Sequence, residues 1–184
     1  MTQSPPHGTF KRVRELLQQM RQAPNIDALA ESWELFLIYH QRTWNRCAAF
    51  YKGKQFWGPL ENRYGARRKA DPLLQYVHQA RHADEHGLAP ITQTLPGFTI
   101  VHSGTILGPS VIVGGGPSVI APGSTAKVEF TATTVAAGPV VNRSVIYQPP
   151  TIDGDTRPPV LKVAEVAIKF YEELFNEIDS AGGD

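Results

Sequence analysis

The sequence predicts an α+β protein, a four-helix bundle with a β-rich insert between its third and fourth helices. Three observations support this class. Residues 8–87 carry apolar side chains at three- and four-residue steps, the spacing of amphipathic helices. Residues 88–150 are rich in Gly, Pro, Ser, Thr and Val and show no helical period. Residues 157–180 are again amphipathic, so their apolar face is expected to complete the bundle.

Three helices are expected before the insert. The first covers residues 10–22, and the second runs from residue 26 to about residue 52 after a break at Pro24. Residues 53–70, rich in Gly, Pro and Arg, are expected to form a loop or short turns. The third helix covers residues 72–86. Its start is marked by an aspartate that can cap the helix and a proline at the first helical position, and Gly87 marks its end.

The insert is expected to form a small antiparallel sheet or sandwich. Its short β-type runs, separated by turn residues, are 98–101, 111–113, 118–120, 127–134 and 140–147. The last helix begins after Pro158-Pro159. Its expected apolar face consists of Val160, Val163, Ala164, Ala167, Phe170, Tyr171, Leu174 and Ile178.

Composition limits the class of protein. The chain has 184 residues, 41% hydrophobic and 19% charged, which suits one soluble domain, or one domain that carries a large appendage. The net charge of +1 gives no general affinity for polyanions. The single cysteine, Cys47, excludes an internal disulfide framework and fits a reducing compartment. No apolar run has the length of a membrane span or of a secretory signal, so we expect a cytoplasmic protein without membrane association.

The charge is unevenly distributed along the chain. Residues 42–69 contain eight cations against one acid, a balance of +7, whereas residues 151–184 have a balance of −5. Six aromatic residues are interleaved with the cations, and this combination can hold a phosphate backbone and stack unpaired bases. The alternative is a solvated helix face with inward-packed aromatics. The candidate nucleic-acid-binding residues are Lys52, Lys54, Arg63, Arg67, Arg68 and Lys69.

The sequence Arg81-His82-Ala83-Asp84-Glu85-His86, at the end of the third expected helix, combines groups suited to phosphodiester chemistry. Arg81 can hold a phosphate through its planar fork of donors, and His86 can transfer a proton near neutral pH. Residues five apart on a regular helix point roughly 140° from each other. The two side chains would therefore converge only if the helix loosens at its end, or if a second copy of the chain supplies a complementary surface.

This sequence resembles the R-[polar]-x3-H motif of HEPN domains, with Arg81, His82 and His86 in the motif positions. HEPN domains are antiparallel helical bundles with this motif late in the third long helix. The resemblance covers about residues 10–87 and 158–180, and the β-rich insert lies outside it.

The resemblance implies a metal-independent endoribonuclease, of the kind found among toxins and phage-defence effectors. His86 would act as general acid or base, Arg81 would hold the scissile phosphate, and His82 would orient the site. The 2′-hydroxyl of the RNA would be the nucleophile, so no cofactor or metal is expected. The resemblance also implies a homodimer with a composite site, and an antitoxin or sensor protein as partner.

Two other functions remain open. The first is a non-catalytic HEPN-like protein that dimerises and binds a partner, with Arg81 bonded to Asp84 or Glu85 and His86 capping its helix. The second is a metal site, because His78, His82 and His86 recur every four residues along one helix face.

Overall fold

The computed structural model describes residues 5–85, 91–95, 98–103, 125–130 and 133–182. Within them the chain is a mixture of helices and small sheets, so the α+β class is confirmed. The helices and strands, in chain order, are α1 (Pro6–Arg21), α2 (Ile26–Phe50), α3 (Trp57–Ala70), α4 (Pro72–Glu85), β1 (Thr92–Leu95), β2 (Phe98–Ser103), β3 (Thr125–Phe130), β4 (Thr134–Ala137), β5 (Val140–Asn142), β6 (Val145–Tyr147) and α5 (Val160–Ser180).

The expected starts of two helices are confirmed by their capping contacts. The Asn25 side-chain oxygen accepts a hydrogen bond from the Ala28 amide at 2.8 Å, which satisfies one of the unpaired donors at the start of α2. The Asp71 carboxylate accepts a hydrogen bond from the Leu73 amide at 2.8 Å, so it caps α4, the helix with the candidate motif.

The expectation of a loop over residues 53–70 is wrong, because residues 57–70 form α3. Pro59 lies in the first turn of this helix, where its missing N–H would have no partner within the helix. Trp57, Leu60 and Tyr64 lie at helical spacing and are all buried. Together they give α3 an apolar face. The described residues therefore form five helices, one more than the four that the sequence predicted.

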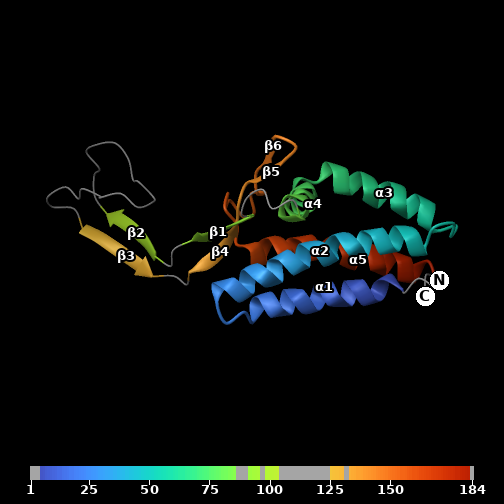
Figure 1. Cartoon of the computed structure of the whole chain (residues 1–184), viewed down its shortest axis with the longest axis horizontal. Coiled ribbons are helices and arrows are strands. Elements are labelled where there is room, and N and C mark those ends of the chain that lie inside the picture. Colours follow the sequence, from blue (N-terminus) through green and yellow to red (C-terminus); the bar gives the residue numbers. More distant parts are fainter. Residues whose placement is uncertain (1–4, 86–90, 96–97, 104–124, 131–132, 183–184) are drawn as a thin grey trace. The chain divides into compact units, whose positions relative to one another are not determined.

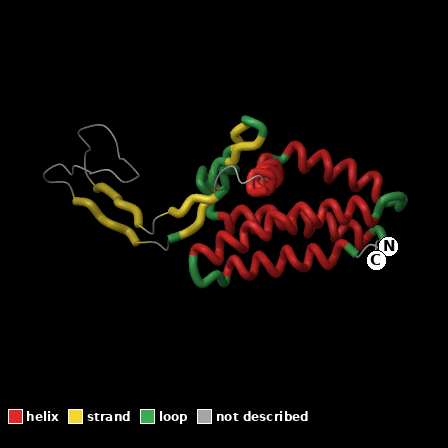
Figure 2. Tube along the Cα trace, in the orientation of Figure 1, coloured by secondary structure: helices red, strands yellow, loops and turns green. Residues whose placement is uncertain are grey.

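Helix α4 has a different direction from the other helices. Figures 1 and 2 show α1, α2, α3 and α5 running lengthwise across the view, with α4 seen end-on. It contacts α2, α3, α5 and β5, and its buried side includes Leu74, Tyr76, Val77 and Ala80. The motif helix therefore runs crosswise to the other helices and packs against α2, α3 and α5.

Helix α5 supplies much of the core, as its apolar periodicity predicts. Ten of its side chains are buried, and Tyr171 donates a hydrogen bond from its hydroxyl to the His40 backbone oxygen of α2 at 2.6 Å. Cys47 is also buried, and burial raises the pKa of its thiol to about 12. Such a thiol is a structural core residue and a poor nucleophile.

The chain separates into two units, Leu95–Thr134 and the remainder. The smaller unit contains β2 and β3, which pair antiparallel from Phe98 opposite Phe130 to Ser103 opposite Thr125. This unit covers fewer residues than the expected insert of residues 88–150. The expected strands at 111–113 and 118–120 lie outside the described residues.

Strands β4, β5 and β6 belong to the same unit as the helices. Val135, Ala137 and Val140 are part of the hydrophobic core, and the Tyr76 hydroxyl of α4 donates to the Gly138 oxygen at 2.7 Å. A side chain at Gly138 would approach the Ile91 oxygen to 3.3 Å, so a glycine suits this close backbone approach. The segment after Thr134 is therefore integral to the helical unit.

None of the helices within the described part of the chain has the length and apolar character needed to cross a membrane.

Candidate functional site

Helix α4 holds the described part of the candidate motif in its last turns. Arg81 and His82 are half-buried there, and each makes at least one polar or ring contact. The helix ends at Glu85. His86 lies outside the described residues, so the expected convergence of Arg81 and His86 stays a prediction.

An open hollow of about 340 Å³ lies between α4 and the β5–β6 hairpin. Helix α4 contributes His78, Gln79 and His82 to its lining, and the hairpin contributes Asn142, Arg143, Val145 and Tyr147. Of the two expected catalytic residues that the structure describes, His82 lines this hollow and Arg81 does not. The four hairpin residues were not anticipated, because they lie about sixty positions from the motif and belong to no recognisable pattern.

A hydrogen-bond network fixes the state of His78 at the inner end of the hollow. The Gln41 side-chain oxygen of α2 accepts a hydrogen bond from Arg68 Nη2 at 2.7 Å and lies 3.0 Å from His78 Nδ1. Because that oxygen can only accept, His78 Nδ1 must carry the proton. The other ring nitrogen, Nε2, then keeps its lone pair when the ring is neutral.

Burial, together with the charges of His82, Arg68 and Arg81, lowers the pKa of His78 to about 4. The ring is therefore neutral at pH 7 and can accept a hydrogen bond. His78 and His82 also touch, with ring centroids 4.5 Å apart and planes nearly perpendicular. One histidine of the hollow is thus held in a single tautomer against the other.

The turn of the β5–β6 hairpin places Arg143 at the edge of the hollow. Arg143 and Ser144 have φ values of 48° and 64°, a left-handed pair that hairpin turns normally assign to Asn and Gly. Asn142 Nδ2 donates to Gln79 Oε1 at 2.6 Å, which ties the hairpin to α4. A long cationic side chain stands where a turn-forming residue would be more stable, and such strain is typical of functional positions.

Two cations of the basic segment form ion pairs with acids near the end of the same chain. Arg63 of α3 pairs with Glu177 of α5, and Arg67 pairs with Glu173. The Tyr64 hydroxyl donates to Glu177 at 2.8 Å, and burial together with this carboxylate raises the pKa of Tyr64 to about 12. The opposite charges of residues 42–69 and 151–184 are therefore explained in part by the contact between α3 and α5.

The other candidate nucleic-acid-binding residues differ in their exposure. Arg68 is half-buried, with its guanidinium 4.6 Å from the centre of the Trp44 ring. Lys52, Lys54 and Lys69 are exposed, and none makes an ion pair with a described residue. Among the six candidates, these three lysines are the ones that are exposed and not paired with a described residue.

The aromatic residues of the basic segment pack inward. Tyr51, Trp57 and Tyr64 are buried, and Trp44, Phe50 and Phe56 pack against the core. They stabilise the contacts of α2 and α3, and they are not exposed as a surface on which bases could stack.

The described residues contain no group of three or more His, Cys, Asp and Glu side chains placed to hold a metal ion. The proposed histidine triad includes His86, which lies outside the described part, so this alternative is left with the His78–His82 pair.

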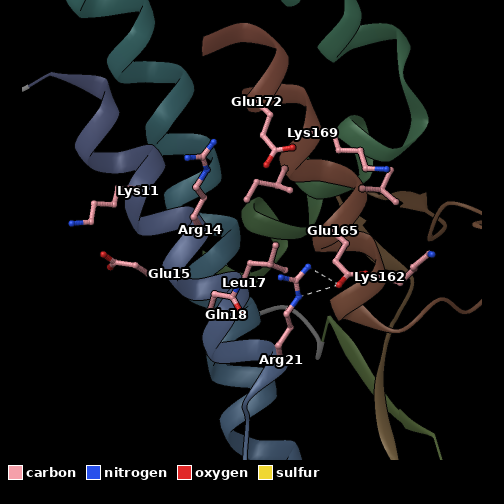
Figure 3. A pocket seen from close by; sticks show the side chains of 12 residues that line it. Lys11, Arg14, Glu15, Leu17, Gln18, Arg21, Lys162, Glu165, Lys169 and Glu172 are labelled. Carbon is pink, nitrogen blue, oxygen red and sulfur yellow. Dashed lines mark hydrogen bonds and ion pairs between the residues drawn. The ribbon is translucent and has the colours of Figure 1, made fainter. Parts of the chain in front are cut away.

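A second hollow, of about 630 Å³, lies between α1 and α5 (Figure 3). Its floor is apolar and its rim carries both signs of charge, including Arg21, which bonds Glu165 through two guanidinium nitrogens at 3.2 and 3.0 Å. In this second hollow, a cation of the rim is therefore already paired with an acid of the same chain. The first hollow differs, because its described lining contains no acid.

Comparison with known proteins finds no matching family model, and no match among curated proteins or solved structures.

Proposed function

We propose that this chain is a metal-independent endoribonuclease that acts at the C-terminal end of α4. One observation carries the proposal: His82, from the motif that resembles HEPN domains, lines an open hollow together with Arg143 and a neutral His78. Imidazole and guanidinium groups around a hollow whose described lining contains no acid suit a phosphodiester substrate.

In the proposed reaction the RNA supplies its own nucleophile. A base removes the proton of the 2′-hydroxyl, the 2′-oxygen bonds to phosphorus, and the bond to the 5′-oxygen breaks as that oxygen takes up a proton. The products are a 2′,3′-cyclic phosphate and a 5′-hydroxyl. His86 is the proposed proton carrier, Arg81 the stabiliser of charge on the phosphate, and His82 the residue that orients the site.

The proposed assembly is a homodimer with Arg81 and His86 near the two-fold axis. Its support is geometric, since roughly 140° separates two side chains five positions apart on a helix. A toxin or defence role, with an antitoxin or sensor protein as partner, rests on the family resemblance alone. The cytoplasm is proposed as the site of action because the single cysteine fits a reducing compartment.

A non-catalytic binding protein is the second candidate, and the β5–β6 hairpin favours it. Val145 and Ile146 are 50% and 61% exposed on this hairpin, which is unusual for two adjacent large apolar residues. A partner that covers them would need no chemistry from α4.

Cleavage of labelled RNA by the full chain tests the first proposal. Wild-type protein is expected to cut, whereas Arg81→Lys and His86→Gln are expected to cut at least a hundredfold more slowly with unchanged circular dichroism. Arg157→Lys, at an exposed position outside the hollow, is the matched control and should retain full activity. Dimeric wild-type protein that cuts no RNA would overturn the enzyme and favour the binding protein.

A further inference from the structure

We propose that the hollow between α4 and the β5–β6 hairpin binds a single nucleotide of the RNA strand, next to the bond that is cut. The inference rests on the proposed function and deepens it, because it assigns a substrate-binding role to residues that lie outside the motif. Three features of the hollow support a nucleotide: a cation for the phosphate, a half-buried ring beside an exposed apolar side chain for the base, and an amide pair for the base edge.

The phosphate contact is assigned to Arg143. Its side chain is exposed, lines the hollow and makes no ion pair with any residue that the structure describes. None of the lining residues that the structure describes is acidic, so none of them competes with a phosphate for the guanidinium. A guanidinium binds a phosphate through two parallel hydrogen bonds, and this geometry favours phosphate over a spherical anion.

The base contact is assigned to the side chains of β6. Tyr147 is half-buried and lines the hollow beside Val145, which is 50% exposed. Like Trp44, Phe50 and Phe56, Tyr147 packs partly against the core, and it also lines the hollow. Aromatic and apolar side chains next to a cation are the usual platform for one unpaired base of RNA.

The amide pair offers a donor and an acceptor for a base edge. Asn142 Nδ2 donates to Gln79 Oε1 at 2.6 Å, and this bond orients both amides. Gln79 Nε2 and Asn142 Oδ1 then have no hydrogen-bond partner among the described residues. A neighbouring donor and acceptor match the alternating groups on the edges of nucleobases. His78 adds a neutral acceptor at the inner end for a hydroxyl group.

Arg143→Asn separates binding from folding. Asparagine tolerates the left-handed conformation better than arginine does, so the variant keeps or stabilises the turn while it removes the guanidinium. Its melting temperature is expected to equal or exceed that of wild type. Arg157→Asn removes an exposed charge elsewhere and is the matched control.

The test is calorimetric titration of full-length His86→Ala, which is expected not to cut RNA. The probes are uridine 5′-monophosphate, adenosine 5′-monophosphate, the two corresponding nucleosides and inorganic phosphate. At least one monophosphate is expected to bind roughly tenfold or more tightly than its nucleoside and than phosphate. Adding Arg143→Asn should weaken that binding by roughly tenfold, Tyr147→Ala should weaken it too, and Arg157→Asn should leave it unchanged.

The outcomes distinguish this inference from the proposed function. Absence of monophosphate binding, or binding that Arg143→Asn leaves unchanged, would overturn the nucleotide site even if the wild-type protein cuts RNA. Binding that depends on Arg143, in a wild-type protein that cuts no RNA, would sustain the site and overturn the ribonuclease.

Discussion

Acid should destabilise this protein well before its carboxylates titrate, because two histidines are held neutral inside it. His40 of α2 is 3% exposed, and its ring packs edge-on against Tyr171 with centroids 4.7 Å apart. Burial lowers the pKa of His40 to about 3, and the charge of Arg68 acts in the same direction. His78 is also held neutral, with its pKa lowered to about 4.

The lowered pKa values of the two histidines determine how the folding stability changes with pH. A histidine in the unfolded chain binds a proton near pH 6.5, whereas the folded chain resists protonation until about pH 3 at His40. Falling pH therefore stabilises the unfolded chain, and stability is lost between about pH 6.5 and pH 3. At pH 5, about 1.5 pH units below the unfolded pKa, His40 alone costs about 2 kcal/mol at 1.36 kcal/mol per unit. His78 is partly solvated, so its contribution to the loss of stability at pH 5 is smaller, about 1 kcal/mol.

Urea unfolding at pH 7, 6 and 5 measures this loss. The free energy of unfolding is expected to fall by about 3 kcal/mol from pH 7 to pH 5, which moves the midpoint by about 1 M or more. His40→Met, of similar volume and without a titrating group, should remove about 2 kcal/mol of that difference. Two results would refute the reasoning. One is a wild-type free energy of unfolding that stays constant from pH 7 to pH 5, and the other is a His40→Met variant whose free energy of unfolding depends on pH as steeply as that of wild type.

Three further predictions concern organisation and surface. Replacing residues 96–133 by a short linker should leave a cooperatively folding helical protein. Excising residues 88–150 should instead give a molten product, because this larger deletion removes the buried Val135 and Val140 and leaves the Tyr76 hydroxyl without its hydrogen-bond partner. Urea unfolding of the two variants measures the difference in cooperativity. Light scattering at micromolar concentration should show a dimer, and a monomer would contradict the composite site. Changing Lys52, Lys54 and Lys69 together to alanine should reduce the salt dependence of RNA binding, while a slope equal to that of wild type would exclude this basic surface.

The helices could be predicted from the sequence wherever apolar periodicity and capping residues agree. The second helix and the motif helix begin as expected, at Ile26 and Pro72, since Asn25 and Asp71 cap them. Helix α3 was missed because Pro59 and the surrounding glycines suggest a loop, and a proline is harmless only in a first turn. Its partner, the acidic face of α5, lies about 110 residues away in the chain.

The site could be predicted only in the part that lies on one helix. His82 follows from the spacing of the motif, whereas Arg143 reaches the same hollow through a hairpin whose packing on α4 depends on tertiary contacts. The charge imbalance was a correct observation with two interpretations. The ion pairs between Arg67 and Glu173, and between Arg63 and Glu177, assign two of its eight cations to internal contacts.

Cleavage of RNA in excess chelator, by wild-type protein and by three single variants at His78, His82 and His86, tests the central claim most directly. If the substrate's 2′-hydroxyl is the nucleophile, wild-type cleavage persists in chelator and His86→Ala abolishes it. His78→Ala should reduce activity by less than tenfold, because His78 contacts the substrate without transferring a proton. Cleavage that disappears in chelator, with equal losses at His78, His82 and His86, would contradict the account and indicate a metal site.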